Sequence, residues 1–157
     1  MNEKDICRIA VRIPFAEDYV TLLGCAIYCF NYYESCIVDI LSILDKGFRQ
    51  KYYRELSLTS GNLNKKFAKI QNAQIATIPG LDRCFSDFSE IIEERNRLIH
   101  SHPVTDVVEN QILNYQADIK KSVHDFKWGR EQIRDFTMCV DECLIRASDF
   151  KVLRMSC

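Results

Sequence analysis

Two arginines, an asparagine and two histidines lie within eight consecutive positions, 95 to 102, near the middle of the chain. They belong to the segment Glu93-Glu94-Arg95-Asn96-Arg97-Leu98-Ile99-His100-Ser101-His102-Pro103. Arginine offers a forked, permanently charged donor that matches phosphate, and histidine exchanges a proton near neutral pH. In RNA the neighbouring 2′-hydroxyl is a built-in nucleophile, so a protein need only position it, deprotonate it and stabilise the developing charge. These residue types predict cleavage of RNA without a metal ion.

A predicted helix that begins at Leu81 positions this segment. Pro103 ends it by about Ser101, because residues before a proline avoid the helical conformation. The apolar residues recur at helical spacing: they are Leu81, Phe85, Phe88, Ile91, Ile92, Leu98 and Ile99.

Helical spacing also predicts which candidate residues lie together. Asn96 and His100 are four positions apart and share a face, and Arg97 precedes His100 by three positions. Arg95 lies on the side of Phe88, so its guanidinium is predicted to face a packed or interface side. A buried arginine needs an anion or an acid there, since burying an unpaired charge is costly.

The run Arg95-Asn96-Arg97-Leu98-Ile99-His100 resembles the signature of the HEPN superfamily, an arginine followed by a polar residue and then a histidine at a helix end. The resemblance implies an all-helical domain that dimerises and brings two Arg/His sets into a shared cleft. Many such proteins are metal-independent endoribonucleases of toxin–antitoxin or phage-defence systems, and others only bind nucleotides or RNA. It also implies that Arg95 binds the scissile phosphate, that His100 acts as acid and base, and that Asn96 orients these groups.

Two other interpretations of the segment stay open. The toxin subgroup places a tyrosine two residues after the histidine, where this chain has His102. Arg97 with His102 also fits the spacing, although the asparagine directly after Arg95 favours Arg95 with His100. Alternatively, the helix end is merely charged: its arginine pairs with Glu93 or Glu94, and the histidines cap carbonyl groups.

A basic stretch between Lys46 and Lys69 is a second candidate for contact with RNA. It holds seven basic residues against one acid, Glu55, with Phe48, Tyr52, Tyr53 and Phe67 interleaved. Cations neutralise phosphates and aromatic faces stack on unpaired bases, so a rim for RNA is predicted. The alternative is a solvated connector whose aromatic residues lie in the core. The predicted RNA-binding residues are Arg97, His102, Lys51, Arg54, Lys65, Lys66 and Lys69.

Apolar periodicity along the chain predicts a single all-α domain over residues 1–157, an up-down helical bundle. Helices are expected at 17–46, 62–75, 81–101 and about 130–151. Residues 48–60 are mixed. Residues 104–128 are expected to form a long loop with a small hairpin, in which Ile112–Tyr115 pairs with His124–Trp128; a helix over 108–125 is the alternative.

The composition is that of an ordinary globular protein, with 47% apolar residues, 27% charged residues and a net charge of −1. The eight cysteines show no metal-binding spacing and no secretory signal precedes them, so reduced thiols and a cytoplasmic location are predicted, with no metal or cofactor. The apolar stretch Tyr19–Phe30 is too short to span a membrane, which predicts a core helix.

The predicted partners follow from the same features. The first helix and the Arg95 side of the 81–101 helix have more apolar surface than one compact bundle buries, which predicts a homodimer. RNA is the predicted ligand. A nucleotidyltransferase-type or other antitoxin protein is a further possible partner, implied by the HEPN resemblance.

Overall fold

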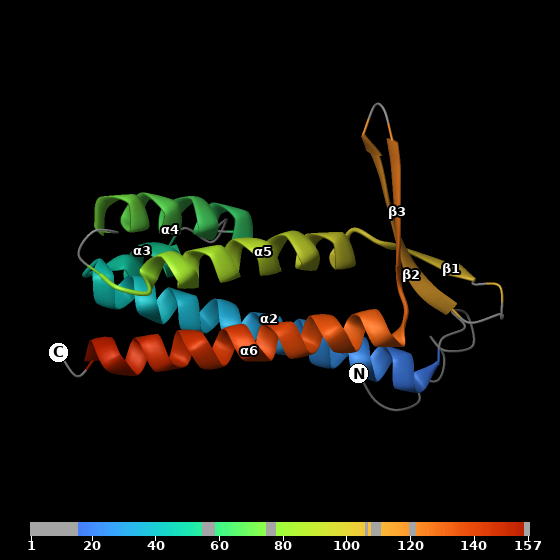
Figure 1. The fold of residues 1–157 in the computed structure, drawn as a ribbon, viewed down its shortest axis with the longest axis horizontal. Coiled ribbons are helices and arrows are strands. Elements are labelled where there is room, and N and C mark those ends of the chain that lie inside the picture. The colour runs from blue at the N-terminus through green and yellow to red at the C-terminus, as the bar shows by residue number, and fades with distance from the viewer. Residues whose placement is uncertain are drawn as a thin grey trace.

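The computed structural model describes residues 16–54, 59–74, 78–105, 107, 111–119 and 122–155. This part of the chain is mainly helical, with a small antiparallel sheet (Figure 1). The helices are α2 (Glu17–Leu44), α3 (Phe48–Arg54), α4 (Ser60–Gln74), α5 (Leu81–Ile99) and α6 (Arg130–Met155). The strands are β1 (His102–Thr105), β2 (Gln111–Ile119) and β3 (Ser122–Trp128).

Helices α2 and α6 lie side by side and run in the same direction (Figure 1). Arg130 Nε donates to Asp18 at 2.7 Å, and Lys151 Nζ donates to Asp39 at 3.2 Å. Both pairs are separated by 112 positions in the sequence, so the two helices stay in register along their length. The long connection between them contains α3, α4, α5 and the sheet.

Helix α5 runs opposite to α6, and α4 packs on the other side of α5. Arg146 Nε of α6 donates to Asp87 at 2.8 Å, whereas Arg154, two turns further along α6, donates to the carbonyl of Pro79 before α5 begins. Ser89 of α5 donates to Asn64 of α4 at 3.1 Å. The three helices α4, α5 and α6 therefore alternate in direction along the chain.

The core lies where α2, α5 and α6 meet. On α2 most buried residues recur every three or four positions, the period that places them on one face. The buried residues are Tyr19, Ala26, Phe30, Tyr33, Cys36, Ile37, Val38, Ile40 and Leu41. By length and composition alone α2 would also be able to cross a membrane. In this structure 39% of its most apolar 18-residue stretch is buried.

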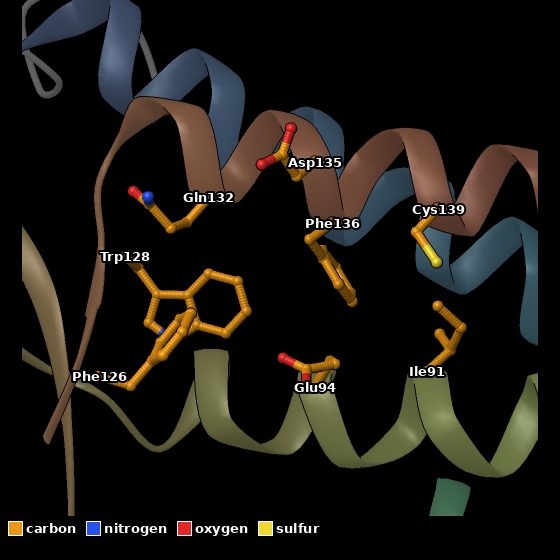
Figure 2. A pocket seen from close by; sticks show the side chains of 8 residues that line it. All are labelled: Ile91, Glu94, Phe126, Trp128, Gln132, Asp135, Phe136 and Cys139. Carbon is orange, nitrogen blue, oxygen red and sulfur yellow. The ribbon is translucent and has the colours of Figure 1, made fainter. Parts of the chain in front are cut away.

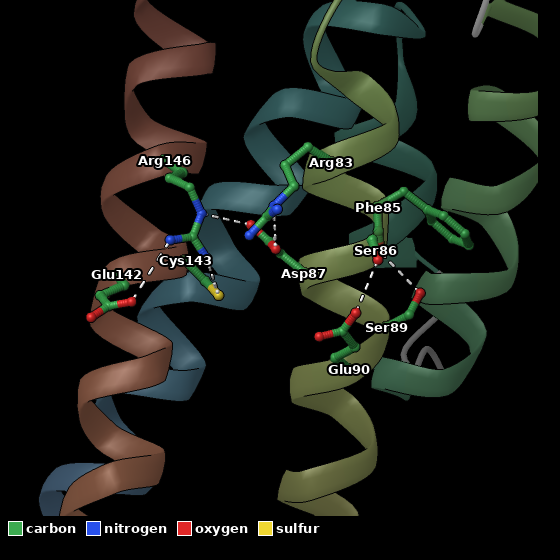
Figure 3. Close-up of polar contacts among 9 residues, drawn as sticks. All are labelled: Arg83, Phe85, Ser86, Asp87, Ser89, Glu90, Glu142, Cys143 and Arg146. Atoms are coloured by element: carbon green, nitrogen blue, oxygen red, sulfur yellow. Dashed lines mark hydrogen bonds and ion pairs between the residues drawn. The ribbon is translucent and has the colours of Figure 1, made fainter.

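A buried carboxylate joins α5 to α6 (Figure 3). The Asp87 side chain is 7% exposed and accepts from Arg146 at 2.8 Å and from Arg83, one turn earlier on α5, at 2.9 Å. Arg146 also donates to the Cys143 sulfur at 3.1 Å. A buried carboxylate needs such partners because water no longer solvates it. Two arginines satisfy it here.

The sheet corrects the expectation for residues 104–128. The hairpin is confirmed, with Leu113 opposite Trp128 and Tyr115 opposite Phe126, and it extends well beyond the predicted strands. The alternative helix over 108–125 is wrong, since 111–119 and 122–128 are strands. β1 was not predicted; Pro103 fits there because β1 is an edge strand, where a missing N–H is tolerated.

The helix predictions hold, with shifted ends. The predicted 17–46, 62–75, 81–101 and 130–151 correspond to 17–44, 60–74, 81–99 and 130–155. Helix α3 lies in the stretch 48–60, for which the sequence showed only a mixed pattern.

Candidate functional site

Arg95 lies in the last turns of α5 and faces α2, as its spacing from Phe88 predicted. Its guanidinium carbon is 5.1 Å from the ring centroid of Phe30, a fully buried residue of α2. Its Nε is buried and has no hydrogen-bond partner among the described residues. The aromatic face attracts the cation, yet it leaves a strong donor unsatisfied.

Asn96 is the only described residue to which an Arg95 nitrogen donates. Arg95 Nη1 donates to Asn96 Oδ1 at 3.2 Å, so the two neighbours predicted to act together do touch. An amide oxygen is uncharged, so this contact leaves the charge of Arg95 without a carboxylate in the described part of the chain.

Arg97 differs from Arg95 in having an acid partner. Its Nη1 donates to Glu94 at 2.7 Å, an i,i+3 pair on the surface of α5. The capping interpretation, an arginine neutralised by Glu93 or Glu94, thus describes Arg97. Arg95, which belongs to the Arg95–His100 register, has no acid partner among the described residues.

His100 and His102 lie where α5 gives way to the sheet. His100 closes the helix, with its backbone N–H donating to the Asn96 carbonyl at 3.1 Å, and its side chain is exposed. His102 is the first residue of β1 and is exposed as well. No contact joins either imidazole to Arg95 in the described residues.

Helix geometry explains this separation. Five residues at about 100° each place His100 about 140° around α5 from Arg95. By the same measure Ile99 and Asn96 lie between them on the helix surface. Ile99 is 42% exposed and contributes an apolar side chain to this surface. Within one chain, Arg95 and His100 therefore lie at the two ends of a surface patch and do not form a contacting pair.

The predicted basic rim is spread over α3 and α4. Lys65 and Lys69 are exposed on α4, and Lys66 beside them is half-buried. Lys51 of α3 pairs with Asp45 at 3.7 Å. Figure 1 places α3 at the end of α2 away from the sheet, whereas α5 brings His100 to the sheet end. The side chain of Arg54 lies outside the described residues.

Two parts of this region were not predicted from the sequence. One is Phe30, whose contact with Arg95 joins positions far apart in the chain and has no local pattern. The other is a cavity between α5, β3 and α6 (Figure 2), whose lining residues are Ile91, Glu94, Phe126, Trp128, Gln132, Asp135, Phe136 and Cys139. In the sequence, the sign of this cavity was the alternation of Phe126 and Trp128 along β3.

Among the described residues no three His, Cys, Asp or Glu side chains gather closely enough to hold a metal ion. The described cysteines are all free thiols: they are Cys25, Cys29, Cys36, Cys84, Cys139 and Cys143. Comparisons with protein-family models, with curated proteins and with solved structures find no match for this chain.

Proposed function

We propose that this chain is a HEPN-type helical domain of up-down bundle architecture that cleaves RNA as a metal-independent endoribonuclease. The alternation of α4, α5 and α6 supports the bundle. The proposed setting is the cytoplasm, in a toxin–antitoxin or phage-defence role, which agrees with the free thiols of the described cysteines.

The observation on which the proposal rests is the state of Arg95. Its Nε is buried without a partner, and its only described acceptor is the neutral amide of Asn96. A half-buried cation whose Nε has no partner lacks part of the compensation that charged groups need away from water. A phosphate oxygen would supply it, because a guanidinium binds phosphate through two parallel hydrogen bonds.

In this proposal two copies of the chain share the site. His100 is turned away from Arg95 of its own chain, so the proton-transferring group would be the partner subunit's His100. The exposed Ile99 between them gives the two copies an apolar contact point. Packing of the two α5 ends around this residue would close a cleft over the scissile phosphate.

The proposal is tested by incubating purified protein with single-stranded RNA in EDTA. Cleavage that leaves a 2′,3′-cyclic phosphate is expected, because attack by the 2′-hydroxyl expels the 5′-oxygen. Arg95→Ala and His100→Ala should each abolish cleavage. Arg134 is an exposed arginine of α6, and Arg134→Ala should leave cleavage unchanged. Intact RNA after incubation with the folded wild type contradicts the proposal.

Binding without turnover is the second candidate, and one observation favours it. The separation of Arg95 and His100 in a single chain suits a module that holds RNA or nucleotide, or docks a nucleotidyltransferase-type partner. It predicts binding that weakens with salt and with the double change Lys65→Gln and Lys69→Gln, both exposed on α4, with no RNA product.

A further inference from the structure

The cavity between α5, β3 and α6 has the size of a site for one flat ring system. Its volume is about 240 Å³, below the roughly 300 Å³ at which sites for drug-sized ligands begin. Phe126, Trp128 and Phe136 line one part of it, and Ile91 and Cys139 lie beyond Phe136 (Figure 2). A cavity of this size with an aromatic lining suits a planar group better than a chain or a sugar.

The rings that line the cavity already form an ordered cluster. Trp128 lies edge-to-face with Phe126 at a centroid distance of 4.9 Å, and with Phe136 at 5.9 Å. Trp128 and Phe136 are buried, but Phe126, at the outer side of β3, is partly exposed. Because Trp128 and Phe136 are buried against each other, a ring that enters the cavity must stack on Phe126.

The polar groups at the cavity select the kind of ring. Glu94 and Asp135 are carboxylates, which only accept hydrogen bonds, and Gln132 offers an amide that accepts and donates. One oxygen of Glu94 is taken by Arg97, and Asp135 is exposed with no ion pair in the described residues. A ligand that fits must therefore present N–H groups at its edge.

A donor inside the cluster also lacks a partner. Trp128 is 1% exposed, and its indole Nε1 has no acceptor among the described residues. A buried indole N–H usually finds an acceptor, but this one has almost no accessible surface, so a ligand in the cavity does not reach it. The accessible lining of the cavity therefore selects a flat ring with N–H donors.

Resting on the proposed action on RNA, we infer that this cavity binds one unpaired nucleobase that carries an exocyclic amine. Guanine, adenine and cytosine present amine donors for the carboxylates, together with ring acceptors; uracil has no amine. Stacking on aromatic residues provides the affinity, as it does in proteins that bind single strands. Arg97 is paired with Glu94, which lines the cavity, and is therefore placed to bind the attached phosphate.

Trp128 is the only tryptophan in the chain, so its fluorescence reports on the cavity directly. Full-length protein is titrated with GMP, AMP, CMP and UMP separately. Saturable quenching by the three amino-bearing nucleotides, with UMP clearly weaker, is expected. Phe126→Ala should weaken binding roughly 5- to 150-fold, the range that corresponds to one stacked base. Asp135→Asn should weaken it as well, and Glu131→Gln, exposed on the same helix, should not.

The outcomes separate this inference from the proposed cleavage. Arg95→Ala should keep the quenching while it loses RNA cleavage, so the two can fail independently. The inference is overturned if no nucleotide quenches the fluorescence. It is also overturned if quenching is the same for all four bases and is unchanged by the Phe126 and Asp135 substitutions. Tighter quenching by a short arginine-rich peptide than by GMP also overturns it, because the carboxylates would then serve a basic protein segment.

Discussion

The guanidinium of Arg95 on α5 rests over the ring of Phe30 on α2, with 5.1 Å between its central carbon and the ring centroid. The two residues are 65 positions apart, and only the antiparallel packing of the helices brings them together. The ring holds the cation by its face and leaves the N–H groups directed elsewhere. Phe30 is therefore the positioning residue for the proposed phosphate site.

Replacing Phe30 with leucine should lower RNA cleavage roughly 5- to 30-fold, the equivalent of about 1–2 kcal/mol of cation–π attraction. The matched control is Phe67→Leu, which removes an equally buried ring from α4, where it packs on Phe85. Both variants should lose comparable stability. Equal loss of cleavage in the two would assign the effect to packing alone and remove the role given to Phe30.

The Tyr19 hydroxyl joins α2 to the sheet. It donates to the Trp128 carbonyl at 2.7 Å and accepts from the Leu113 N–H at 2.9 Å. Tyr19→Phe should lower the free energy of unfolding by about 1–3 kcal/mol, because two backbone groups lose their partner. Denaturant unfolding measures this, with Tyr28→Phe, 72% exposed, expected within about 0.5 kcal/mol of wild type. A Tyr19→Phe protein as stable as that control contradicts the prediction.

The spacing of residues along the sequence was sufficient to predict the features that depend on a single helix. The period of Phe88, Ile91 and Arg95 predicted that Arg95 faces the packed side, and the structure agrees. The same spacing separates Arg95 from His100 around the helix, so a single chain does not bring together the arginine and histidine to which the resemblance gives a joint role. Whether a partner restores their proximity is a property of two chains, which one sequence does not display.

The sheet shows a different limit. Pro103 was a reliable sign that α5 ends, but strand β1 depends on pairing with 111–114, which no local pattern encodes. On β2 the buried face includes Asn114, so the apolar alternation that identifies a strand is interrupted there. Both the pairing of β1 and the burial of Asn114 depend on tertiary packing.

Asp87→Asn should destabilise the protein by about 1–3 kcal/mol. The change removes the charge that compensates Arg146, although partial exposure of both arginines lets water offset some of the loss. Glu90→Gln is the control on the same helix, since Glu90 is exposed and accepts only from Ser86 at 3.0 Å. Thermal unfolding of the two variants side by side should separate them; overlapping melting curves would show that Asp87 contributes little.

Two buried thiols predict how stability changes in alkali. Burial raises the pKa of Cys84 from 9.0 to about 11 and that of Cys143 to about 12. Above about pH 9 the unfolded chain loses these protons first and binds fewer than the folded one, so the free energy of unfolding falls as pH rises. Each thiol should contribute up to about 1.4 kcal/mol per pH unit until Cys84 ionises in the folded state near pH 11.

The double variant Cys84→Ala/Cys143→Ala isolates this effect. Its unfolding free energy, followed by urea titration from pH 8 to pH 10.5, should decline less steeply than that of the wild type. The change Cys25→Ala, which removes an exposed thiol, should keep the wild-type slope. Identical slopes in all three proteins would show that the buried thiols do not drive the decline.

Co-expression of Arg95→Ala and His100→Ala chains, followed by an RNA cleavage assay in EDTA, shows whether two copies of the chain share one site. If one copy supplies Arg95 and its partner supplies His100, each mixed dimer keeps one complete site. We expect each variant alone to be inactive and the mixture to recover roughly a quarter of the wild-type rate, as random pairing of two chains into symmetric dimers requires. Cleavage that survives in either single variant, or a mixture as inactive as its components beside an active wild type, would contradict it.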